Sequence, residues 1–460
     1  MKRITLYLFN IVICLAVFAQ KQTPPAGGTP KDFTLPEKTT FKLDNGLTVV
    51  MVPYGNLPKV TVSAVVKTGN IHEGEGQIWL ADITADLMQE GTTTRTAQEV
   101  SLAAANMGGQ INIGVGPNQT TASGEVLSEF GADLVGLIAD VLQQPAFPGG
   151  ELSRLINDRK RDLSVQMSRP QPQATEKFNK IIYGNHPYGD IYPTEEILDS
   201  YTIDDVRKFY SDNFGAQRTV VYVAGVFNEV EMKEAITKAF SEWVTGPAVS
   251  FDVPEAVAKP GVEILDRADA PQSTIIMGLP VVDPSHPDFI PLSVTNYLLG
   301  GSFASRITSN IREDKGYTYS PRSTVDTRYG AATWYEMADV TTDVTGPSLK
   351  EISYEINKLR SEVPGVEELD GIKNYRAGIF VLQNSSPGGI IGQLSFLDLY
   401  GLDDSYLTEY VKNVYAVTPE QVTEMTRKYL DYEKMTIVVV GDKKVIEKQI
   451  EDYQNALDNF

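Results

Sequence analysis

The segment TIDDVRKFYSDNFGAQRTVVYVAG, residues 202–225, is matched later in the chain by TPEQVTEMTRKYLDYEKMTIVVVG, residues 418–441. Each copy predicts a helix with a threonine N-cap, a short turn, and a β-branched strand that ends in glycine. The two threonines are as far apart in the sequence as the two terminal glycines. We therefore expect an internal duplication of the chain.

The rest of the chain groups strands together and helices together. LTVVMVP and VTVSAVVKTG read as neighbouring strands, and helical patterns follow them. Such grouping predicts an α+β fold of two duplicated halves, each a mainly antiparallel sheet packed with helices. We place the halves at residues 35–243 and 262–458, joined by an extended, proline-rich linker at 244–261.

The N-terminus predicts export. Lys2 and Arg3 precede a short apolar run that ends in small residues, which is typical of a signal peptide over residues 1–19. Residues 20–34 read as a flexible lead-in, and no later segment is apolar and long enough to cross a bilayer. The single cysteine, Cys14, lies inside the signal, so thiol chemistry is excluded after cleavage. We expect a secreted, periplasmic protein.

The net charge of −20 argues against a nucleic-acid partner, because neutralising phosphates requires clustered lysine and arginine. An acidic surface favours basic partners or peptides, or it serves only solubility.

One predicted helix carries an unusual pair of acids. In WLADITADLMQEGTTTRT, residues 79–96, Asp82 and Asp86 stand four positions apart and share one helix face. Leu80, Ile83 and other apolar residues occupy the buried positions around them.

Several motifs in order resemble the insulinase/pitrilysin-type (inverzincin) metallopeptidases, which include the mitochondrial processing peptidase. They are LDNGLTVVMVP, LADITADLMQEGTTTRT, NHPYGD, YTIDDVRKFYSDNF and LLGGSFASRITSNIREDKGYTYS. The resemblance extends over residues 38–455. It implies a processing-peptidase-like fold.

In active members of that family the helix carries His-x-x-Glu-His, in which the histidines bind zinc and the glutamate is the general base. The resemblance places Asp82 and Asp86 at the histidines, Ala85 at the glutamate, and Asp162 at the third ligand, or Asp158 if the alignment slips by a turn. A methyl group cannot accept a proton from water, so we expect no hydrolysis by the isolated chain and no zinc cofactor in it. A carboxylate-bound cation at the three aspartates is the alternative.

The second half retains an Arg/Tyr pair that the family uses in catalysis. The resemblance places the pair at Arg312 and Tyr319, where a cation and a phenol would stabilise a peptide oxyanion. The structural alternative is an ordinary salt bridge from Arg312 to Glu313 or Asp314 and a core aromatic at Tyr319. A lost zinc motif with a retained Arg/Tyr pair implies a non-catalytic subunit that completes the active site of a zinc-bearing homologous partner.

The resemblance also implies a peptide or unfolded polypeptide as substrate, docked on a sheet edge at Gln110, Ile111 and Asn112. From another class of function, the chain is a peptide-binding or scaffold protein with the peptidase fold and no hydrolytic complex. The sequence leaves open the substrate, the partner, and whether the assembly is a homodimer or a heterodimer.

Overall fold

The computed structural model describes residues 31–457, and from Asp32 onward these residues form one compact unit. The predicted signal peptide, residues 1–19, and most of the predicted lead-in, residues 20–34, lie outside the described residues. Of the helices described, none is both long and apolar enough to span a membrane.

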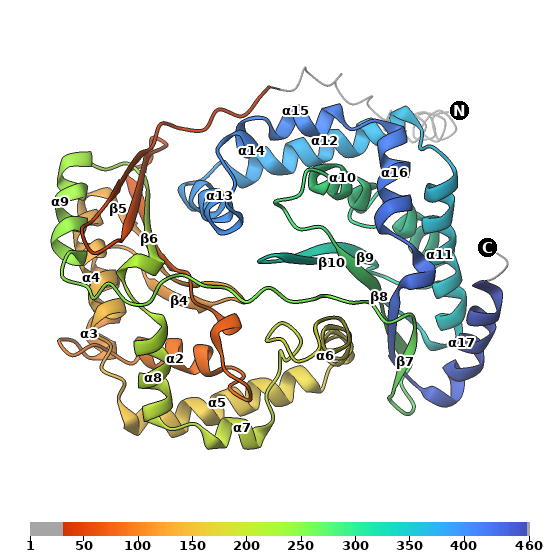
Figure 1. Ribbon diagram of the computed structural model, residues 1–460, viewed down its shortest axis with the longest axis horizontal. Helices are drawn as coiled ribbons and strands as arrows, with labels where there is room; N and C mark the ends of the chain where they lie inside the picture. Colours follow the sequence, from red (N-terminus) through yellow and green to blue (C-terminus); the bar gives the residue numbers. More distant parts are fainter. Residues whose placement is uncertain (1–30, 458–460) are drawn as a thin grey trace, which may run out of the picture. The chain divides into compact units, whose positions relative to one another are not determined.

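The first half contains a six-stranded sheet (Figure 1). Its strands follow the order β1-β2-β6-β3-β5-β4, in which β2 and β6 are parallel and the other neighbours are antiparallel. The strands are β1 (Thr39–Lys42), β2 (Thr48–Pro53), β3 (Lys59–Val66), β4 (Ile111–Val115), β5 (Thr120–Leu127) and β6 (Thr219–Gly225). The helices are α2 (Leu80–Gln89), α3 (Ala97–Asn106), α4 (Gly131–Gln143), α5 (Gly149–Met167), α6 (Pro170–Tyr183), α7 (Glu195–Ser200), α8 (Ile203–Asn213) and α9 (Glu229–Phe240).

The second half contains a five-stranded sheet of order β7-β11-β8-β10-β9, in which only β7 and β11 are parallel. Its strands are β7 (Gly261–Asp266), β8 (Gln272–Val281), β9 (Arg322–Arg328), β10 (Ala331–Thr341) and β11 (Thr436–Gly441). The helices are α10 (Phe289–Leu299), α11 (Thr345–Ser361), α12 (Val366–Gln383), α13 (Pro387–Tyr400), α14 (Ser405–Thr408), α15 (Tyr410–Ala416), α16 (Pro419–Tyr429) and α17 (Lys443–Leu457), together with the π-helix η4 (Thr308–Asp314).

The two sheets have the same topology once β1 is set aside. The order β2-β6-β3-β5-β4 corresponds strand for strand to β7-β11-β8-β10-β9, and the parallel pair falls at the same place in both. The repeated sequence segments form α8 and β6 in the first half and α16 and β11 in the second. The predicted α+β class with duplicated halves is therefore confirmed.

Both repeated helices begin as their sequences predict. The hydroxyl of Thr202 accepts from the Asp205 backbone N–H, and that of Thr418 accepts from Gln421. In each case the residue at the third helical position bonds back to the threonine, which completes a capping box.

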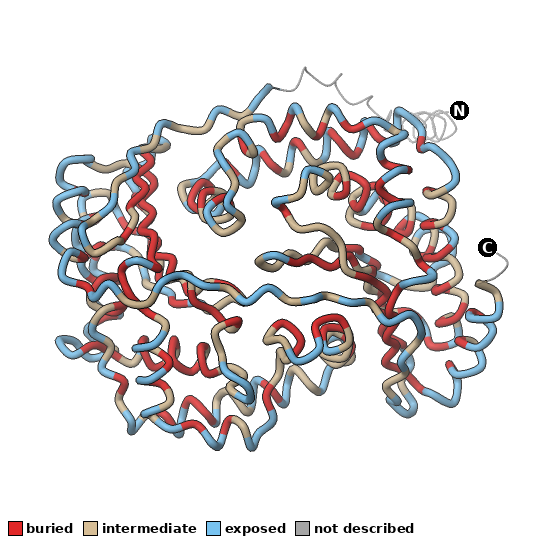
Figure 2. The backbone as a smooth tube through the Cα atoms, in the orientation of Figure 1, coloured by how far each residue is buried: buried red, intermediate tan, exposed pale blue. Residues whose placement is uncertain are grey.

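The central strands are buried on both faces, as Figure 2 shows by the red that follows the strands. Every residue of β6 is buried. Val221 and Val223 face a core built with the helices of the first half, whereas Val220 and Tyr222 face a core that includes α13 of the second half. Such burial on both faces explains the uninterrupted apolar run of this strand.

Each half contributes one helix to the sheet of the other. Helix α6 packs on β8 and β11, where Ala174, Phe178 and Ile182 join a core with Ile276 and Val438. Helix α13 packs reciprocally on β3 and β6. The halves therefore share cores.

The segment between α9 and β7 is extended and is held by two of the three histidines. His72 Nε2 donates to Ser250 O at 2.9 Å, and His186 Nε2 donates to Asp252 O at 3.2 Å. The ring of Phe251 packs on Tyr329, with 4.3 Å between centroids. These histidines thus have a structural role in fixing the linker.

Candidate functional site

Helix α2 turns its apolar side into the core and leaves the two acids on the opposite side. Leu80, Ile83 and Leu87 are buried in the core of the first half. The residue before the helix, Trp79, has a left-handed backbone (φ 67°), and its indole Nε1 donates to Ile191 O at 3.0 Å. Asp82 and Asp86 are only 20% and 23% exposed in their side chains, because α5 covers this helix face.

Arg159 of α5 bridges the two acids. Its Nε and Nη2 donate to Asp86 at 2.7 and 2.9 Å, in a two-pronged contact, and its Nη1 lies 3.5 Å from Asp82 Oδ1. Such fork-to-carboxylate pairs are stronger than single hydrogen bonds. The positive charge between the two aspartates is therefore a guanidinium supplied by the chain itself.

A second layer of polar contacts surrounds Asp82. Asn70 Nδ2 donates to Asp82 Oδ2 at 2.8 Å and to Glu73 Oε1 at 3.1 Å, and Glu73 Oε1 also accepts from Ala81 N at 2.8 Å. Burial raises the pKa of the Glu73 carboxyl to about 8. Burial also raises the pKa of Asp82, against the attraction of Arg159.

The other residues of the zinc motif form no hydrogen bond or ion pair with Asp82 or Asp86 in the described chain, although the charge of Asp162 still attracts Arg159. Ala85 is 3% exposed and belongs to the core. Asp162 is exposed, and Asp158 pairs with Arg154 and Arg161 on its own helix. Arg159 contacts both acids from α5, the helix on which we expected the third zinc ligand. The basic run DRKR at 158–161 is the sequence feature that indicates such an arginine, but it contains three basic residues that could play the part.

This donor set does not suit zinc. The two carboxylates already bind Arg159, and over residues 31–457 no group of three or more His, Cys, Asp or Glu side chains could hold a metal ion. Zinc sites use neutral imidazoles or thiolates with at most a few carboxylates. With Ala85 in place of a base, the cluster is an ion-pair network between two helices.

The retained pair of the second half forms an aromatic sandwich. The guanidinium of Arg312, on η4, lies 4.4 Å from the ring centroid of Phe303 and 5.1 Å from that of Tyr319. Both rings are largely exposed, Phe303 at 70% and Tyr319 at 80%. Arg312 also pairs with Glu313 at 3.2 Å.

The structure separates the two neighbouring tyrosines. Tyr317 packs partly buried against the core of the second half, whereas Tyr319 lines a cavity of about 510 Å³ together with Arg312 and Phe303. The only first-half residue in the wall of that cavity is Gln171 of α6. The structure therefore brings Arg312 and Tyr319 together, but it does not bring them to Asp82 and Asp86.

The predicted peptide edge lies beside α2. Strand β4 is the outer strand of its sheet and contacts α2. Asn112 is exposed, Ile111 is half-buried and packs on the core, and Gln110 precedes the strand.

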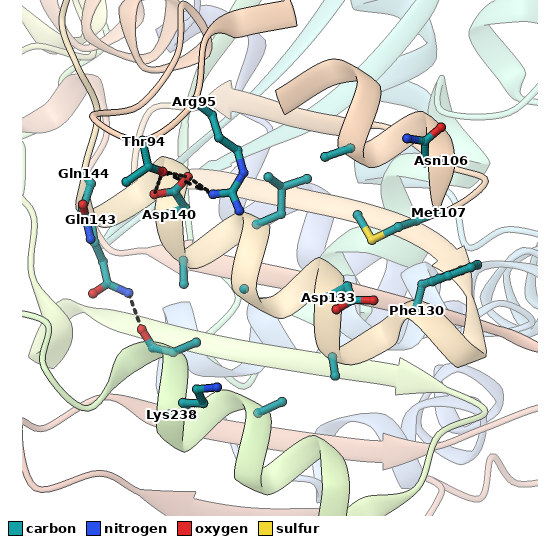
Figure 3. A pocket seen from close by; sticks show the side chains of 17 residues that line it. Thr94, Arg95, Asn106, Met107, Phe130, Asp133, Asp140, Gln143, Gln144 and Lys238 are labelled. Atoms are coloured by element: carbon teal, nitrogen blue, oxygen red, sulfur yellow. Dashed lines mark hydrogen bonds and ion pairs between the residues drawn. The ribbon is translucent and has the colours of Figure 1, made fainter. Parts of the chain in front are cut away.

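Another hollow of the first half lies elsewhere, between α3, α4 and α9. It measures about 910 Å³, and none of the predicted site residues lines it. Figure 3 shows Thr94 and Arg95 bonded to Asp140 at one end and Lys238 on the opposite wall. Its charged groups at that end are paired with one another.

Comparison with known proteins agrees with the fold and the motifs. The family description "Insulinase (Peptidase family M16)" matches residues 49–192, and "Peptidase M16 inactive domain" matches residues 200–375. The chain belongs to this insulinase-type peptidase family and carries its inactive-type domain. Asp82 and Asp86 lie within the first match, which is the peptidase part of the family. The loss of the zinc motif is therefore shown by the residues at 82–86 and not by the name of the second match.

Relatives cover more than half of the chain, and up to 84% of it. The chain is 24% identical to the uncharacterized zinc protease YmxG of Bacillus subtilis, over 84% of this chain and 94% of that protein. It is 24% identical to the probable mitochondrial-processing peptidase subunit beta of Schizosaccharomyces pombe, over 58% and 59%. A crystal structure of a peptidase M16 inactive domain from Pseudomonas fluorescens superposes with a TM-score of 0.81 at 23% identity, over 88% of this chain and 98% of that one.

Proposed function

We propose that this chain is the non-catalytic subunit of a periplasmic zinc endopeptidase. It supplies Arg312 and Tyr319, and half of a substrate chamber, to a homologous subunit that carries zinc. The substrate is a peptide or an unfolded polypeptide.

The observation that carries the proposal is the contrast between the two motifs. The metal motif is closed by Arg159, which binds both acids, whereas Arg312 is held between two exposed rings at a cavity. Both rings line this cavity with Arg312, so they are available to a bound ligand.

The chemistry of the pair suits peptide hydrolysis. The guanidinium and the phenol are donors that can stabilise the negative charge of a tetrahedral intermediate. Because the cavity wall contains no residue of α2 or α5, and the only ion-pair partner of Arg312 in the described chain is its exposed neighbour Glu313, the pair can complete the active site of another subunit.

The relatives support the proposal in their names. One is called a zinc protease and another a subunit of a processing peptidase, a name that implies assembly with a second chain. The predicted signal peptide supports the periplasmic location.

The test is reconstitution with a homologue from the same genome that contains His-x-x-Glu-His and a signal peptide. Cleavage of internally quenched peptides and complex formation by size exclusion are measured together. We expect hydrolysis only from the mixture, and Arg312→Ala to lower kcat by about 10²–10³ with assembly intact. Arg207→Gln, at an exposed ion pair of α8, is the control.

Full activity of Arg312→Ala would contradict the composite site. A partner that cleaves equally well alone would also contradict it, and would favour a peptide-binding scaffold without hydrolysis.

A further inference from the structure

A second cleft follows the outer strand β9 of the second half. It has a volume of about 520 Å³, within the range of ligand sites, and five of the seven residues of β9 line it. Helices α10, α12, α13, α14 and α15 form its other walls. The aromatic side chains in these walls are Phe289, Tyr297, Phe380, Phe396, Tyr406 and Tyr410.

The cleft is basic although the protein is strongly acidic. Arg322 and Arg376 line it, and its wall contains no aspartate or glutamate. Neither arginine forms an ion pair with any residue between 31 and 457, and the buried Nε of Arg376 has no hydrogen-bond partner there. Arg376 donates from Nη2 to Tyr410 and lies 4.1 Å from the ring centroid of Tyr297.

One buried carboxyl group, that of Glu336, lies close enough to interact with the charge of Arg322. Glu336 of β10 is fully buried, and both of its oxygens lack a hydrogen-bond partner within the described chain. Burial raises the pKa of Glu336 well above its ordinary value, against the attraction of Arg322, and so favours the uncharged form of this carboxyl. Because the wall of the cleft contains no aspartate or glutamate, its positive charge is left to an outside group.

The cleft is the counterpart of the acid pair in the duplicated fold. Arg376 stands eleven residues before Pro387, which begins α13, just as Arg159 stands eleven residues before Pro170, which begins α6. Helices α5 and α12 precede the two exchanged helices, so the two arginines occupy equivalent places.

The acids that neutralise Arg159 have no equivalent here. The buried positions 81, 83–85, 87 and 88 of α2 recur with the same spacing at 292, 294–296, 298 and 299 of α10. This correspondence sets Asp82 and Asp86 against Ser293 and Tyr297, and the ring of Tyr297 contacts Arg376 as Asp86 contacts Arg159. The first half thus pairs Arg159 with two acids of its own, whereas the second half places no acid of α10 against Arg376.

The strand that lines the cleft can accept another strand. Ser323 N donates outward to Gly300 O at 3.1 Å, so Val325 and Thr327 turn their N–H groups the same way. Within residues 31–457 neither N–H has a partner on that side. An extended peptide that pairs with an open edge places alternate side chains on one face.

We infer that this cleft binds an acidic segment of an extended polypeptide, which pairs with the edge of β9 and directs carboxylates to Arg322 and Arg376. The bare charges, the aromatic walls and the open edge all fit such a ligand. The inference concerns the chain alone and does not require the proposed peptidase complex.

Fluorescence anisotropy of labelled peptides on the purified protein tests the inference. The probe is a decapeptide that alternates Glu and Thr, and its comparison peptide alternates Gln and Thr. We expect the Gln peptide to bind about tenfold or more weakly, since a hydrogen-bonded charge is lost at each contact. Arg322→Gln and Arg376→Gln should each weaken the Glu peptide by a similar factor, whereas Arg207→Gln should leave its affinity unchanged.

Val325→Pro removes an outward N–H from an edge strand, where proline is tolerated, and should weaken both peptides. Thermal unfolding confirms that each variant is folded; Arg322 is exposed, so its variant carries the test if Arg376→Gln unfolds. Equal affinity for the two peptides, or unchanged binding by Arg322→Gln, would overturn the inference. Saturation by inorganic phosphate without binding of either peptide would reduce the cleft to a small-anion site and overturn it as well.

Discussion

Arg159 Nε lies 2.7 Å from Asp86 Oδ2, and the same guanidinium reaches Asp82. Helices α2 and α5 would share a zinc ion in an active relative. Here the guanidinium of Arg159 joins them instead. This ion-pair network carries a fixed positive charge and has no open coordination position. It can therefore stabilise the fold, but it cannot activate water.

Removing the guanidinium should destabilise the protein. Arg159→Gln leaves two partly buried carboxylates close together, and we expect the free energy of unfolding in urea to fall by about 1–3 kcal/mol. Adding Asp82→Asn and Asp86→Asn should recover much of the loss, because the repulsion disappears. Arg161→Gln, on the same helix but 75% exposed, should cost less than about 0.5 kcal/mol.

Arg159, as well as the two acids, should prevent zinc from binding at the degenerate motif. We expect no stoichiometric zinc in the purified protein by elemental analysis. Asp82→His with Asp86→His should still bind little zinc, because Arg159 retains its positive charge between the ligands.

Adding Arg159→Glu should supply the third ligand and give about one zinc per chain, in the His₂Glu arrangement of catalytic sites. With Ala85 unchanged, this variant should bind zinc without cleaving peptides. Tight zinc binding by the histidine pair alone would show that Arg159 does not block the site.

The aromatic sandwich should matter to the proposed complex. Phe303→Leu removes a cation–π contact to Arg312, and we expect kcat of the reconstituted complex to fall about two- to fivefold. Tyr319→Phe keeps the ring but removes the hydroxyl, so a larger fall would assign the phenol to the transition state. Equal effects of the two variants on KM alone would instead indicate substrate binding.

Stability should depend on pH through Glu73. A carboxyl with a pKa raised from 4.5 to about 8 binds more protons in the folded than in the unfolded state. The stability from this group is therefore full below about pH 4.5 and is lost as the pH rises to about 8, at no more than about 1.4 kcal/mol per pH unit.

Glu73→Gln should remove this slope. The difference in free energy of unfolding between wild type and variant, measured from pH 5 to 8, should change steadily in favour of the variant. The raised pKa of Asp82 acts in the same direction and remains in both proteins. A difference that is constant with pH would contradict the prediction.

The sequence alone determined the duplication, because helix caps and β-branched strands are local patterns that repeat wherever the topology repeats. It also determined that the zinc motif is lost, since Asp82, Ala85 and Asp86 stand at known spacing on one helix. The spacing between Arg312 and Tyr319 in the sequence was likewise evident without the structure.

Only the tertiary structure decided which groups meet across elements. Arg159 is one of three neighbouring basic residues, and the packing of α5 on α2 selects it. The exchange of α6 and α13 between sheets, the ring of Phe303 beside Arg312, and the correspondence of Arg376 with Arg159 all join residues distant in sequence. The local conformational preferences of the residues do not predict such contacts. The contacts depend on which apolar faces of helices and sheets pack against one another.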